Sequence, residues 1–196
     1  MNLWLSLLIL LAPIKIESGH FTIYQDGKKI GTEEFSVSQR SGGYLALGHT
    51  QISVGTQMFD LRSHMELDPQ LKVTFYEFRS NGNVVHLKVG KPISDLEFTI
   101  DGKTQPHEVN FPGDGAIIDD NFFHHYLILL YRAGAKETTV ATFVPQQMTI
   151  GALTVRPTGN LTFEIETSNV KMVATTDPEG RLMRITVPGA KVVVER

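Results

Sequence analysis

The chain has 196 residues, of which 41% are hydrophobic and 20% charged, with a formal net charge of −3 at pH 7. These proportions are typical of a folded globular protein and exclude an intrinsically disordered chain. The small negative charge gives no electrostatic basis for binding nucleic acid. The chain has no cysteine, which excludes disulfides, zinc–thiolate sites and thiol nucleophiles.

Residues 1–18 resemble a secretory signal segment. The run Leu3–Ala12 is almost entirely apolar, and Pro13 ends it well short of the roughly 20 apolar residues that cross a membrane. No Lys or Arg precedes this run and no small-x-small cleavage motif follows it, unlike a standard signal peptide, and a buried first strand is the alternative. We predict export to the periplasm or the extracellular space, with residues 19–196 forming a single domain.

From Phe21 onward, short segments alternate apolar and polar residues with period two. Examples are "HFTIY", "EEFSVS" and "LKVTFYEF" in the first half and "LTFEIET", "LMRITV" and "KVVVE" in the second. Turn signals separate the segments, and Asn81-Gly82 is typical of a two-residue hairpin turn. The pattern predicts a mainly β protein of about twelve antiparallel strands. We expect them to form a curved meander, either a β-roll or a half-barrel, because a flat sheet of this size is unfavourable.

One long apolar segment, "DDNFFHHYLILLYRAG" from Asp119 to Gly134, interrupts the strands. Asp119 or Asp120 can accept hydrogen bonds from the first N–H groups of a helix, and Gly134 is a suitable left-handed cap at its end. A helix that is apolar on nearly every side must be buried. We therefore predict one mid-chain helix over residues 120–133, lying in the concave face of the sheet.

Aromatic residues of the predicted strands and helix are candidates for lining a ligand site on this concave face. The same residues would serve equally well as ordinary core. The candidates are Phe59, Phe75, Phe98, Phe163, Phe122 and Tyr126.

A second candidate site is polar and consists of Asp120, His124 and His125. Adjacent histidines on a helix point about 100° apart and cannot chelate one metal, whereas Asp120 and His124 share a face. We expect both histidines at the wet rim of the helix, bonded to loop backbone. The alternative is a hydrolytic or metal-dependent enzyme, which would need a third polar group such as Glu33 or His107. No metal or other cofactor is predicted.

Four segments carry a resemblance to a family: "GKKIGTEEFSV", "DDNFFHHYLILL", "FVPQQ" and "GRLMRITVPGAKVVVER". They resemble exported bacterial β-rich domains of unknown function, which occur alone or ahead of secreted α/β-hydrolase domains. The curved sheet of those domains is similar to lipoprotein-carrier-like and glycolipid-binding β-rolls. The resemblance implies an apolar ligand in the concave face.

Together these observations predict an exported, non-catalytic binding module that holds a lipid, a glycolipid or another apolar small molecule. A membrane surface or a protein is a further candidate partner. The alternative is an accessory or scaffold domain that supports a hydrolase. A persistent pocket beneath the helix would favour the binding module, and a solid interior would favour the scaffold.

Overall fold

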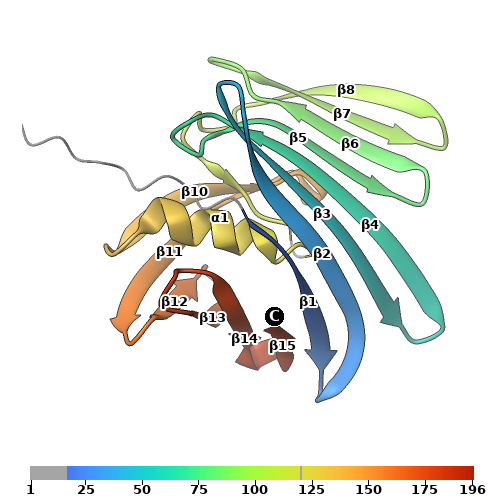
Figure 1. Ribbon diagram of the computed structural model, residues 1–196. Helices are drawn as coiled ribbons and strands as arrows, with labels where there is room; N and C mark the ends of the chain where they lie inside the picture. The colour runs from blue at the N-terminus through green and yellow to red at the C-terminus, as the bar shows by residue number, and fades with distance from the viewer. Residues whose placement is uncertain (1–16, 120) are drawn as a thin grey trace, which may run out of the picture.

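The computed structural model describes residues 17–119 and 121–196. They form one strongly curved sheet with a single α-helix lying inside the curve (Figure 1). No helix of this part of the chain is long and apolar enough to cross a membrane. The predicted leader, residues 1–18, lies almost wholly outside the described residues, although β1 already includes its last two positions.

The elements follow one another along the chain in two series of strands separated by the helix. The first series is β1 (Glu17–Gln25), β2 (Lys28–Arg40), β3 (Gly43–Val54), β4 (Gln57–Leu67), β5 (Val73–Ser80), β6 (Asn83–Lys88), β7 (Ser94–Ile100) and β8 (Lys103–Val109). A short strand, β9 (Ala116–Ile117), precedes the helix α1 (His124–Ala133). The second series is β10 (Thr138–Val144), η1 (Pro145–Gln147), β11 (Thr149–Gly159), β12 (Thr162–Glu166), β13 (Lys171–Thr176), β14 (Leu182–Val187), η2 (Pro188–Ala190) and β15 (Val192–Glu195).

The strand order is β8-β7-β6-β5-β4-β3-β2-β1-β15-β14-β13-β12-β11-β10-β9. Each series is thus a meander, and the antiparallel pairing of β1 with β15 joins the two at the middle of the sheet. Every neighbouring pair is antiparallel except β9 and β10. The predicted fold class, a curved antiparallel sheet with one buried helix, is confirmed.

The sheet has fifteen strands instead of about twelve. Several of the strands are short, and β9 has only two residues, too few to produce a periodic pattern in the sequence. The turn predicted at Asn81-Gly82 joins β5 to β6, with φ of 48° and 85° at these residues. Both values lie in the left-handed region that a two-residue hairpin turn requires.

Inward-facing positions of the strands and most of α1 make up one core. Only Tyr131 and Arg132 of the helix are more than slightly exposed. The helix ends at Gly134, as predicted, with a φ of 58°. It begins four residues later than predicted, at His124, and its first turn contains no acidic residue. The prediction that Asp119 caps the helix is therefore wrong, and Asp120 lies outside the described residues.

Candidate functional site: an apolar cavity and the polar anchor beside it

A cavity of about 470 Å³ lies between α1 and inward-facing residues of both strand series. Its wall is mostly aliphatic, and its polar members are neutral: Gln25, Asn121, Thr142 and Thr167. A pocket of this size with an apolar wall and a few uncharged polar groups is typical of a site for a small apolar ligand. The apolar lining residues are Ile23, Ile30, Ile52, Val54, Ile118, Phe123, Tyr126, Val144, Leu153, Val170, Met172, Val187, Ala190 and Val192.

The period-two pattern of the strands builds this wall. In β1 the inward positions Phe21 and Ile23 are buried, and Ile23 reaches the cavity. Near the strand ends the lining becomes exposed, with Val54 at 58% and Val170 at 41% of full exposure. The cavity therefore opens to solvent between the connections that join β3 to β4 and β12 to β13.

The N-terminal end of α1 is fixed by a carboxylate from the sheet. Glu33 of β2 is fully buried, and its Oε2 accepts a hydrogen bond of 2.7 Å from the Phe123 N–H. Its Oε1 accepts a longer one, 3.3 Å, from the His124 N–H. A negative charge at this end suits the helix dipole and satisfies N–H groups that have no partner within the helix.

The same carboxylate holds the side chain of His124, which is also fully buried. His124 Nδ1 lies 2.5 Å from Glu33 Oε1, and Nε2 lies 3.5 Å from the Ser63 hydroxyl. Nδ1 must carry a proton to donate to the carboxylate, which leaves Nε2 to interact with Ser63. The expectation that His124 lies at the wet rim is wrong, because the curve of the sheet encloses this end of the helix.

Gly48 of β3 makes this close approach possible. A Cβ at Gly48 would lie 2.8 Å from Ser63 Oγ and 2.9 Å from His124 Nδ1, which is closer than real Cβ contacts. The only signal of this contact in the sequence is a glycine inside a strand, since such a glycine often marks the place where another group approaches the backbone.

The order carboxylate, imidazole, hydroxyl is also that of an acid–base–nucleophile relay. A relay needs an accessible nucleophile, and Ser63 is only 4% exposed although it borders a concavity of about 550 Å³ on the sheet. The imidazole of His124 is stacked parallel to the ring of Phe35 at 6.2 Å between ring centres. With every member buried, Glu33, His124 and Ser63 are placed to anchor the helix to the sheet, and we call them the polar anchor.

His125 is buried beside the polar anchor, 2% exposed, and neither of its ring nitrogens has a hydrogen-bond partner. The centre of its ring lies 4.5 Å from the ring centre of His124 and 5.7 Å from the ring centre of Tyr76. Burial, with a smaller contribution from His124, lowers the pKa of His125 well below its usual value of 6.5. Burial therefore favours the neutral form of His125 in the folded protein, and this residue, like His124, lies far from the wet rim.

Asp119 orders the turn that leads into the helix. Its Oδ1 accepts hydrogen bonds of 3.0 Å from both the backbone and the side-chain nitrogen of Asn121. Its Oδ2 accepts a hydrogen bond of 2.7 Å from the Tyr76 hydroxyl and another from the side-chain nitrogen of Gln146. Burial raises the pKa of the Asp119 carboxyl, although these hydrogen bonds act in the opposite direction. The cluster links β5, η1 and the segment before α1.

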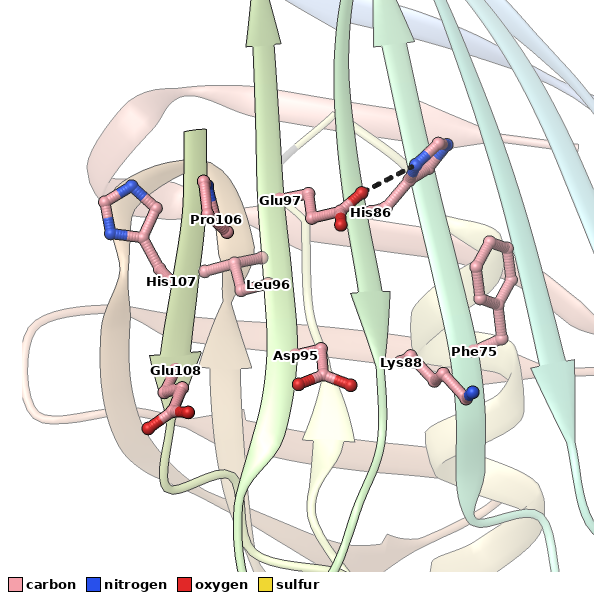
Figure 2. A pocket seen from close by; sticks show the side chains of 9 residues that line it. All are labelled: Phe75, His86, Lys88, Asp95, Leu96, Glu97, Pro106, His107 and Glu108. Atoms are coloured by element: carbon pink, nitrogen blue, oxygen red, sulfur yellow. Dashed lines mark ion pairs between the residues drawn. The ribbon is translucent and has the colours of Figure 1, made fainter. Parts of the chain in front are cut away.

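A larger concavity, of about 630 Å³, lies on the outward face of β5 to β8 (Figure 2). Its lining includes one lysine, three carboxylates and two histidines, and His86 Nδ1 lies 4.0 Å from Glu97 Oε2. His86 also pairs with Glu77 at 2.6 Å. Because this lining is rich in charged side chains on the outward face of the sheet, we assign the candidate site to the smaller, apolar cavity.

The structure distributes the predicted residues among several places. Of the aromatic candidates, Tyr126 lines the cavity. Phe122 is fully buried against Phe78, Phe75 lies in the outward groove of Figure 2, and Phe59, Phe98 and Phe163 pack at the margin of the core.

Among the polar candidates, Glu33 converges with His124, whereas His107 lies on β8 beside Phe98. Within residues 17–119 and 121–196, no group of three or more His, Asp or Glu side chains is placed to hold a metal ion. Sequence reasoning did not find Ser63, Gly48 or the aliphatic wall of the cavity, since a valine or isoleucine of a strand looks the same whether it faces a cavity or solid core.

No family model and no curated protein matches this chain. Its fold is similar to the crystal structure of a DUF1089-family protein from Pseudomonas aeruginosa, with a TM-score of 0.54 and 12% sequence identity over 97% of each chain. At this identity the likeness shows the fold alone. The predicted resemblance to lipoprotein-carrier-like domains and to domains ahead of hydrolases stays a prediction.

Proposed function

We propose that this protein is a non-catalytic binding module that holds the apolar part of a lipid, a glycolipid or a similar small molecule in the cavity beside α1. The observation that carries the proposal is the cavity itself. Its wall comes from both strand series and the helix, contains no charged side chain, and opens to solvent. An uncharged wall favours a hydrocarbon and opposes a buried ion.

The alternative of a scaffold domain would be favoured by a solid interior, and a cavity of about 470 Å³ speaks against it. The enzyme alternative lacks support for a different reason, because the members of the polar anchor are at most 4% exposed. Export to the periplasm or the extracellular space remains part of the proposal, and it rests on the sequence of residues 1–18.

The first experiment is to purify the protein under native conditions, extract it with organic solvent and identify bound molecules by mass spectrometry. We expect a lipid or another apolar compound at close to one per protein. Binding is then measured with a fluorescent fatty acid, whose emission rises in an apolar site. Protein that carries no ligand and does not bind the fatty acid would contradict the proposal.

A matched pair of variants places the binding in this cavity. Ala190→Trp puts a large side chain at an exposed lining position of η2, and we expect it to weaken fatty-acid binding at least tenfold by blocking the opening. Ala135→Trp puts the same side chain at an exposed position after α1, and we expect no change. Equal effects of the two variants would show that the probe binds elsewhere.

A further inference from the structure

We propose that the opening of the cavity docks on an anionic lipid surface, so that the ligand passes between membrane and cavity without crossing water. This inference deepens the proposed function and rests on it. The docking surface, which we call the rim, consists of four strand connections together with the strand ends that flank them, residues 25–30, 53–58, 166–171 and 187–192. Each of these connections contributes at least one residue to the cavity wall.

The first observation is the exposed apolar surface of the rim. Met58 is 71% exposed, Val54 58% and Val170 41%. Val54 and Val170 also line the cavity, so the apolar surface continues from the interior to the outside. Apolar side chains that project from strand connections can enter the boundary between headgroups and acyl chains, and an amphiphile could leave the membrane along them.

The second observation is the charge of the rim. It carries four lysines, Lys28, Lys29, Lys171 and Lys191, against two carboxylates, Asp26 and Glu166, whereas the chain as a whole has a net charge of −3. The positive charge is therefore concentrated where the cavity opens. Anionic lipid attracts such lysines when they lie near the surface.

Lys28 and Lys29 are the most available of the four. Lys191 pairs with Asp26 at 3.0 Å and Lys171 with Glu164 at 3.3 Å. Among the described residues, no ion pair involves Lys28 or Lys29, and both side chains are exposed. Stable but reversible attachment to a membrane usually needs two weak signals together, and the rim combines an apolar one with a basic one.

The test is sedimentation with lipid vesicles of two compositions. We expect the protein to pellet with vesicles that contain phosphatidylglycerol, to stay in solution with pure phosphatidylcholine, and to be released by salt. Lys28→Glu with Lys29→Glu should weaken vesicle binding at least tenfold, and Met58→Glu several-fold. None of these three residues lines the cavity, so all variants should bind the soluble fatty-acid probe like the original protein.

Control substitutions lie at the opposite ends of the strands. Lys136→Glu, before β10, and Ile93→Glu, before β7, change exposed side chains of the same types and should leave vesicle binding unchanged. Equal losses for the rim and control variants, or no binding to anionic vesicles, would overturn the docking proposal.

Two further outcomes separate the two proposals. Loss of vesicle binding with intact probe binding in the rim variants supports docking as a step distinct from ligand binding. Vesicle binding through the rim by a protein that binds no probe would support docking and contradict the cavity's proposed function. If the rim instead bound a protein partner and ignored vesicles, the membrane proposal would be wrong.

Discussion

The two sides of α1 are built in opposite ways. At its N-terminal end, Glu33, His124 and Ser63 are buried, and a single carboxylate contacts two backbone N–H groups and an imidazole. Beside Phe123 and Tyr126, the helix leaves a cavity of about 470 Å³ against residues of both strand series. Polar contacts fix the position of the helix where it meets β2, and mostly aliphatic side chains line the side that faces the cavity.

This difference indicates how a buried helix can leave room for a ligand. A helix held only by apolar packing would shift to fill a neighbouring void, because voids cost dispersion energy. The polar anchor has directional bonds that fix the position of α1 relative to β2. We therefore expect the anchor to keep the cavity open as well as to stabilise the fold.

Removal of the carboxylate should have the largest effect on stability. Glu33→Ala leaves His124 Nδ1 and two N–H groups without their acceptor in a dry site, and we expect a loss of about 3–5 kcal/mol in the free energy of unfolding. The measurement is urea unfolding followed by circular dichroism. If the anchor keeps the cavity open, the folded fraction should also bind the fatty-acid probe more weakly.

The neighbouring residue provides a matched control. Glu34 points to the opposite, exposed face of β2, so Glu34→Ala should change the stability by less than about 0.5 kcal/mol. Addition of His124→Ala to Glu33→Ala should cost less than the sum of the single effects, since both remove the same contact. Strict additivity would contradict the anchor as a unit.

An added methyl group at Gly48 tests the contact between sheet and helix from the other side. Gly48→Ala should destabilise the protein by about 1–3 kcal/mol, because the new Cβ overlaps His124 and Ser63 and forces the helix away. Gly151→Ala is the matched control in β11, where the nearest atom would be Thr142 Oγ1 at 3.5 Å. Thermal unfolding of both variants would reveal the difference, and equal melting temperatures would show that the helix approaches Gly48 less closely.

The smallest expected effect is a pH dependence that arises from His125. Its pKa is lowered by burial in the folded state, so the unfolded state binds more protons as the pH falls below 6.5. The folded protein should therefore lose about 1 kcal/mol of stability between pH 7.5 and pH 5.5 through this residue.

His125→Leu should remove that loss and raise the stability, because it replaces a ring with two unpartnered nitrogens by an apolar side chain of similar size. Urea unfolding at pH 5.5 and 7.5 compares the variant with the original protein. An unchanged pH dependence in the variant would assign the acid sensitivity to other groups.

The sequence by itself determined the local structure of this protein. Period-two alternation predicted the strands, Asn81-Gly82 predicted the turn between β5 and β6, and the apolar run predicted one buried helix that ends at Gly134. These features depend on side-chain direction and on backbone dihedral angles within a few residues, both of which are encoded locally.

Only the tertiary structure decided the site. Glu33 and His124 are separated by 91 positions in the sequence, and their contact depends on the path of a sheet that curves around the helix. Neither residue type predicts its partner in the sequence. His124 and His125 were expected at the solvent-exposed edge of the helix, and both are instead buried. The cavity is decided in the same way, because whether Ile52 or Leu153 faces a void depends on how closely distant surfaces pack.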